Sequence, residues 1–168
     1  EEGYRNLLKL SSRGHLEGFY YKPRIDRELL GELHGGLIAI APAFDSDIRA
    51  LLSMGDGKAL YERINWYQMI FGRDGFYLEV SRHPQIEGHD AMMEQFIELG
   101  RQKEVPLVAS QEVYYLHPEE KKARETLLLV NSQAEGPKDF QTDDSDFSFM
   151  SLEETEKLFT DIPEAIEN

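Results

Sequence analysis

The sequence contains no cysteine, which excludes disulfide bonds and every metal site built from thiolates. It also has no apolar run near the roughly 20 residues that a membrane-spanning helix needs, and nothing in it resembles a signal peptide. These absences are compatible with a cytoplasmic protein, and we expect no association with a membrane.

Basic residues are scarce. The 168 residues include 18 Lys and Arg against 32 Asp and Glu, which gives a formal net charge of −14 at pH 7. Contacts to nucleic-acid phosphates need an excess of Lys and Arg, so the composition argues against a dedicated nucleic-acid surface. The motifs of phosphate-binding loops, dinucleotide folds, serine hydrolases and zinc proteases are also missing.

What is present fits one soluble domain, because 168 residues with 40% hydrophobic and 30% charged content can bury a sizeable core. A helical pattern begins almost at the first residue, and another begins within residues 162–168. We therefore expect a piece of a longer polypeptide.

Strand and helix patterns alternate along the chain. Apolar or alternating runs predict strands at residues 37–41, 76–80 and 106–113. Periodicity and capping residues predict helices over 3–16, 27–34, 57–71 and 88–103, with others after Ser46, Pro118 and Ser151. This order is typical of an α/β fold with parallel strands and helical crossovers. A closed (β/α) barrel needs about eight strands, so the pattern indicates part of a barrel.

The periodicity also predicts which helix faces are buried. In the first helix the buried face would carry Tyr4, Leu7, Leu8 and Ser11. In the helix after Pro118 the stripe Ala123, Leu127 and Val130 would face inward. Residues 133–146 have little apolar content and predict a solvated loop.

The stretch 106–118 is the best candidate for a site. Its apolar strand ends in the polar group Ser110-Gln111-Glu112, and Pro118 then opens a helix. In parallel α/β folds, site residues gather at the C-terminal ends of strands.

Two other groups have competing interpretations. Glu79, His83 and His89 are residue types that bind zinc, but core or surface roles are favoured because the spacing places them around a loop. Tyr20, Tyr21, Lys22, Arg24 and Arg27 combine aromatic and basic side chains, as nucleic-acid contacts do. A packed aromatic strand with solvated bases is the favoured interpretation of this second group.

Several stretches resemble one family. Residues 3–10 (GYRNLLKL) and 16–30 (LEGFYYKPRIDRELL), followed by 36–40, 76–79, 106–109 and 158–168, are similar to the PHP domain of the bacterial replicative DNA polymerase III alpha subunit. The resemblance implies that residues 1–168 are a single partial PHP domain, the later part of a distorted (β/α)7 barrel. The first metal ligands would precede Glu1 and the polymerase domains would follow Asn168.

The chain departs from the family at its metal site. The resemblance implies ligands at positions 43, 112 and 114, where metal-binding members carry Cys, Asp and His. This sequence has Ala43, Glu112 and Tyr114. Ala43 has no donor atom, Glu112 carries its carboxylate further out, and the Tyr114 phenol ionises only near pH 10. We therefore expect no metal and no catalytic residue in this piece.

Two functions remain open. The favoured one is a non-catalytic structural and docking module of a DNA-directed DNA polymerase. Its partners would be the rest of the polymerase chain and the separate proofreading exonuclease subunit. DNA would be reached through the parent enzyme, which would use Mg²⁺, and not clearly through this piece. The alternative is an active metal-dependent phosphoesterase or 3′–5′ exonuclease that uses Glu112 with Glu79 or His83.

Overall fold

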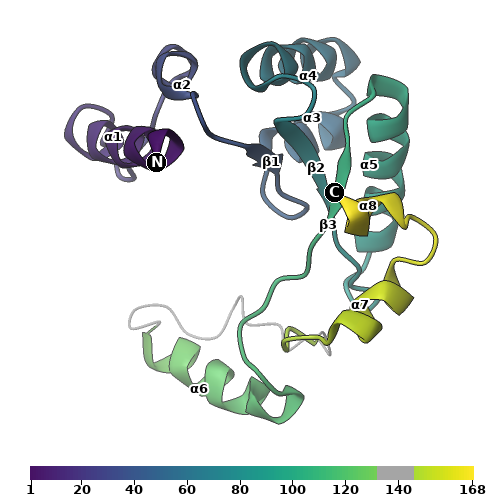
Figure 1. Cartoon of the computed structure of the whole chain (residues 1–168). Coiled ribbons are helices and arrows are strands. Elements are labelled where there is room, and N and C mark those ends of the chain that lie inside the picture. The colour runs from purple at the N-terminus through teal and green to yellow at the C-terminus, as the bar shows by residue number, and fades with distance from the viewer. Residues whose placement is uncertain (132–145) are drawn as a thin grey trace. The chain divides into compact units, whose positions relative to one another are not determined.

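The computed structural model describes residues 1–131 and 146–168 (Figure 1). The chain divides into two compact units. The first unit comprises residues 1–78 and 103–106, and the second comprises residues 79–102 and 107–168. All of the predicted 133–146 loop except Asp146 lies outside the described residues.

The first unit contains most of the regular structure predicted for the N-terminal half. Its elements are α1 (Glu2–Leu16), α2 (Arg27–Leu33), β1 (Ala39–Ala41), α3 (Asp47–Met54), α4 (Gly57–Phe71) and the start of β2 (Phe76–Val80). Helices α2, α3 and α4 begin where side-chain oxygens cap free N–H groups, whereas α1 has no side-chain cap. Asp26 accepts a hydrogen bond from the Leu29 N–H at 2.8 Å, and Ser46 and Asp56 do the same for α3 and α4.

The three strands form one sheet in the order β1-β2-β3, where β3 is Leu107–Ala109. β1 runs parallel to β2, with Ala39 opposite Phe76. β3 runs in the same direction, because the partners advance from Pro106 to Ser110 as β2 advances from Leu78 to Val80. Helices α3 and α4 separate β1 from β2 in the sequence, and α5 (His89–Lys103) separates β2 from β3.

The predicted α/β class and the parallel order are therefore confirmed, although β3 is shorter than the predicted 106–113. Three described strands do not close a barrel, and the complete barrel stays a prediction. The alternating burial of β2 follows the two-residue period of a strand, since Phe76, Leu78 and Val80 are buried.

The predicted inner face of α1 is wrong. The residues buried on α1 are Gly3, Asn6, Leu10 and Gly14, whereas Tyr4, Leu7, Leu8 and Ser11 are exposed. The reason is a close backbone approach that apolar periodicity does not encode. A Cβ on Gly3 would lie 1.9 Å from the Gly36 carbonyl oxygen, and the Asn6 amide donates to the Gly35 carbonyl at 2.9 Å.

The second unit holds α5, β3 and the C-terminal helices. These are the 3₁₀ helix η1 (Pro118–Glu120), α6 (Lys121–Asn131), α7 (Leu152–Leu158) and α8 (Glu164–Glu167). The predicted capping box at Ser151 is present, with Glu154 as its reciprocal partner. α8 packs against β3. The core residues of this unit come mainly from α5, β3 and the C-terminal segment: Val80, Met93, Phe96, Ile97, Leu99, Leu107, Tyr115, Phe159, Ile162 and Ala165.

The predicted inner stripe of α6 is also wrong. Ala123 is exposed, and Leu127 and Val130 have 60% and 65% of their surface exposed. The periodicity correctly indicated an amphipathic helix, but it could not show whether the described residues supply a surface for the apolar face.

Candidate functional site

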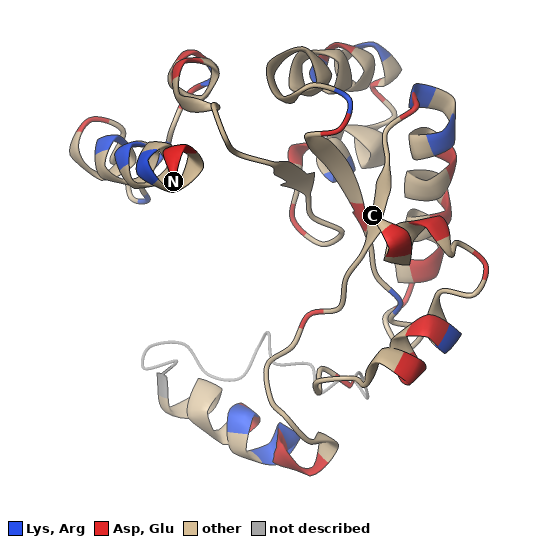
Figure 2. Cartoon of the chain, in the orientation of Figure 1, with Lys and Arg blue, Asp and Glu red and all other residues tan. Residues whose placement is uncertain are grey.

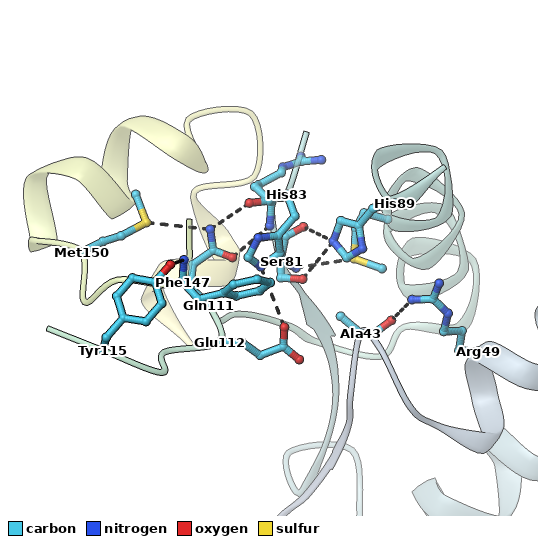
Figure 3. A network of polar contacts seen from close by, with 12 residues as sticks. Ala43, Arg49, Ser81, His83, His89, Gln111, Glu112, Tyr115, Phe147 and Met150 are labelled. Atoms are coloured by element: carbon cyan, nitrogen blue, oxygen red, sulfur yellow. Dashed lines mark hydrogen bonds and ion pairs between the residues drawn. The ribbon is translucent and has the colours of Figure 1, made fainter. Parts of the chain in front are cut away.

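Two histidines of the predicted Glu79, His83 and His89 group are buried: His83 lies in the loop after β2, and His89 is the first residue of α5. Both imidazoles are almost fully buried, and their rings lie 5.4 Å apart in an edge arrangement. His89 Nε2 lies 3.0 Å from the Ser81 hydroxyl and 3.3 Å from the Ser81 carbonyl oxygen. Burial therefore shows that both histidines are core and not surface residues, and Figure 3 shows them beside Ser81.

Gln111 ties the end of β3 to this loop. Its side-chain oxygen accepts from the Arg82 N–H at 3.1 Å, and its amide nitrogen donates to the Arg82 carbonyl at 2.9 Å. The Gln111 side chain thus makes the same pair of hydrogen bonds with Arg82 that the backbone of a neighbouring strand would make. The two bonds fix the distance between the end of β3 and the loop after β2. Figure 3 shows Gln111 between the loop and Met150, whose sulfur lies 3.8 Å from the amide nitrogen.

Glu112 faces the same loop. Its carboxylate oxygen lies 3.9 Å from His83 Nε2. Burial, and then the negative charge of Glu79, raise the pKa of the Glu112 carboxyl above its ordinary value. The sequence analysis grouped Glu112 with Glu79 and His83 in the hypothesis of a metal-dependent enzyme. In the structure, Glu112 lies near His83 because β3 pairs with β2.

Tyr114 does not fill a buried site. Its ring is half exposed, with the Arg124 guanidinium carbon 3.8 Å from the ring centroid and the Phe147 ring 5.2 Å away. No hydrogen bond joins the Tyr114 hydroxyl to Gln111 or Glu112 among residues 1–131 and 146–168. The phenol is therefore held by a cation–π contact at the surface.

Ala43 lies in the first unit and follows β1. It is completely buried, and its carbonyl oxygen accepts a hydrogen bond of 2.5 Å from the Arg49 side chain. Arg49 also stands over the Phe44 ring, with its guanidinium carbon 5.8 Å from the ring centroid. A methyl side chain at this position supplies no ligand atom, so any donor that the family places here is missing.

These residues can be tested against the needs of a metal ion. A site for zinc or a two-metal centre needs three or more converging His, Cys or carboxylate side chains. No group of three that could hold a metal ion exists within the part of the chain that the structure describes. Glu112 and His83 supply two donors, which is incomplete, and Tyr114 and Ala43 do not add a third.

Sequence reasoning missed two parts of this arrangement. It listed His89 without its partner Ser81, and it included Gln111 only as one of three polar residues. A small polar residue directly after Val80, at the C-terminal end of β2, was the available signal for Ser81. The contact of Gln111 with a backbone 29 residues earlier has no local signal.

Comparisons with known proteins identify the class of domain. Residues 1–83, just under half of the chain, match the family described as the PHP domain.

The whole chain is similar to part of DNA polymerase III subunit alpha. Relatives with that name include those of Borreliella burgdorferi (35% identity over the whole chain), Deinococcus radiodurans (38% over 79% of the chain) and Treponema pallidum (32% over the whole chain). The chain spans 15%, 10% and 14% of these three relatives. The resemblance inferred from the sequence is confirmed. No helix among the described residues is long and apolar enough to cross a bilayer.

Proposed function

We propose that this chain is a non-catalytic PHP module of a DNA-directed DNA polymerase of the DNA polymerase III alpha type. The observation that carries the proposal is the ligand set. Ala43 offers no donor atom, Tyr114 lies half exposed against Arg124, and the Glu112 carboxylate has one imidazole within 4 Å. The whole protein would replicate DNA in the cytoplasm with Mg²⁺ in a separate polymerase domain.

The module would act as a support and as a docking surface. Its partners would be the remaining polymerase chain and the proofreading exonuclease subunit. In support, α6 presents Leu127 and Val130, which are three positions apart on one helix face, to solvent, and exposed apolar side chains of this kind favour association. Leu127→Glu should weaken co-elution of the chain with a purified exonuclease subunit, whereas Leu16→Glu, an equally apolar exposed position on α1, serves as the matched control.

One observation favours the alternative, a metal-dependent phosphoesterase or 3′–5′ exonuclease. His83 and Glu112 approach within 3.9 Å, and Glu79 is close enough to raise the pKa of Glu112. A cation between such groups would relieve the repulsion of the two carboxylates. This candidate needs further ligands from outside the 168 residues.

One experiment separates the two functions. Metal content is measured by mass spectrometry on the complete polypeptide, together with hydrolysis of a generic phosphodiester with added Mn²⁺ or Zn²⁺. We expect less than one tightly held ion per chain in the module and no hydrolysis that depends on Glu112. Two or more bound ions, with hydrolysis abolished by Glu112→Ala and retained in the exposed control Glu104→Ala, would establish the enzyme instead.

A further inference from the structure

The segment Gly18–Ile25, here called the aromatic turn, presents three large rings to solvent. Phe19, Tyr20 and Tyr21 have 60%, 64% and 83% of their surface exposed. The sequence-based preference for a packed aromatic strand is therefore wrong, because these rings have no core to pack into within the described residues. Three adjacent exposed aromatic side chains are unusual for a soluble surface and mark an interaction site.

The aromatic turn is held in one conformation. The Tyr20 N–H donates to the Lys22 carbonyl at 3.1 Å, and Tyr21 between them has a φ of 59°, a left-handed value that bulky side chains rarely adopt. The two ends of the aromatic turn lie close together, since a Cβ on Gly18 would lie 2.0 Å from the Arg24 carbonyl oxygen. These contacts restrain the backbone that carries the exposed rings, which reduces the entropy lost on binding.

Positive charge accompanies the rings. Residues 18–25 contain Lys22 and Arg24 and no acidic residue, in a chain whose net charge is −14. The Arg24 guanidinium carbon lies 5.4 Å from the Tyr20 ring centroid, and the Tyr20 and Tyr21 rings meet edge to face at 4.6 Å. In the ranges 1–131 and 146–168, Lys22 makes no ion pair. Basic residues recur along α1 as well, as Figure 2 shows.

Three of the acidic residues next to the turn, Glu17, Glu32 and Asp26, have a polar partner. Arg13 contacts Glu17 at 3.0 Å and Glu32 at 3.4 Å. Asp26 accepts from the backbone at the start of α2. Glu28 carries its charge in the first turn of α2. One guanidinium is shared by two carboxylates, and Asp26 is matched by a helix N–H group, so part of the local negative charge is neutralised.

We propose that the aromatic turn binds single-stranded nucleic acid, with one or two unpaired bases stacking on Tyr20 and Tyr21. Lys22 and Arg24 would contact the flanking phosphates. Every base has a flat face and every linkage a phosphate, so binding would be largely independent of sequence. The negative charge of the whole chain would keep the affinity low and strongly dependent on salt. The proposal does not depend on the proposed function of the metal-site positions.

The first test is fluorescence anisotropy of a labelled 20-nucleotide oligothymidylate titrated with the intact chain at low salt. We expect saturable binding that Tyr20→Ala and Tyr21→Gly each weaken roughly 5- to 100-fold, the range measured for loss of one stacked base. Glycine relieves the left-handed backbone strain at Tyr21, so this variant should keep or increase its thermal stability while losing affinity. Lys22→Gln should weaken binding and lower by about one the number of counterions released on binding, which is read from the slope of log affinity against log salt concentration.

The second test locates the contact. An oligonucleotide with 5-iododeoxyuridine is cross-linked by light to the aromatic side chain beside it, and the modified peptide is identified by mass spectrometry. We expect the cross-link at Tyr20 or Tyr21. The matched control is Tyr61→Ala, which removes another exposed tyrosine with a cation, Lys103, over its ring, and it should bind like the unaltered chain.

Four outcomes would overturn the proposal. The first three are no binding at low salt, equal loss of affinity in Tyr61→Ala and Tyr21→Gly, and cross-links outside residues 18–25. Equal or tighter binding of the same sequence as a duplex would also contradict it, because paired bases cannot stack on the rings. A surface that binds only a protein partner would give the first of these outcomes.

Discussion

Replacing Gln111 by alanine should destabilise the second unit by about 2–3 kcal/mol. The side chain makes two hydrogen bonds with the Arg82 backbone, of 3.1 and 2.9 Å, and each is worth about 1 kcal/mol net. The backbone groups left without a partner in a part-buried place add a desolvation cost. At this chain length, a loss of 2–3 kcal/mol lowers the melting temperature by about 4–12 °C.

Urea denaturation followed by circular dichroism measures the effect, with two variants beside it. Gln111→Glu keeps an acceptor for the Arg82 N–H but loses the donor to the Arg82 carbonyl, so it should lose part of the stability. Gln102→Ala removes an exposed amide that bonds only Glu98 at 2.7 Å, and it should change stability by less than about 0.5 kcal/mol. A Gln111→Ala variant as stable as Gln102→Ala would refute the view that this side chain holds β3 to the loop after β2.

Glu112→Gln should stabilise the chain at pH 7, because the raised pKa means that ionisation of Glu112 costs more in the folded state than in the unfolded state. The protonated Glu112 carboxyl contributes fully to stability below its ordinary pKa of 4.5, and this contribution is lost as the pH rises through the folded pKa. The stability gained by Glu112→Gln should therefore vanish in acid. Equal stability of Glu112→Gln and the unaltered chain at pH 7 would contradict the pKa shift. Gly3→Ala should destabilise by about 1–2 kcal/mol, since the new Cβ would meet the Gly36 carbonyl oxygen at 1.9 Å, whereas Gly57→Ala, where a Cβ meets nothing within 4 Å, should be neutral or stabilising in the same melting experiment. The chain should associate at micromolar concentration through its edge strands, and Ile40→Lys on β1 should reduce that association in sedimentation velocity; a monomer at all concentrations would argue against open edges.

Local patterns predicted the elements well where their signals were strong. The predicted helix 57–71 has the same bounds as α4, and the alternation of residues 76–80 is the burial pattern of β2. Asp26 and Ser151 cap the helices that follow them, because capping depends on residues three positions apart. Strand ends were less certain, since only Leu107–Ala109 of the predicted 106–113 is regular strand.

Burial was predicted less well than structure type. Leu7 and Leu8 stand at helical spacing, yet α1 buries Gly3 and Asn6 because two backbones approach closely there. Tyr20 and Tyr21 are residues typical of packed strands, yet the tertiary structure leaves them on an exposed turn. Periodicity shows that a helix or strand has two faces, and only the neighbouring elements decide which face is covered.

The sequence by itself determined the α/β class, the order of elements and which donor atoms the side chains at positions 43, 112 and 114 carry, because these follow from local patterns and from atoms that a side chain has or lacks. Ala43 has no donor in any fold. Only the tertiary structure decided that Glu112 faces His83, that Gln111 replaces a strand partner for Arg82, and that the Tyr21 ring is exposed. Each of these depends on a contact, or the lack of one, between residues far apart in the chain, and such contacts are set by the packing of whole elements.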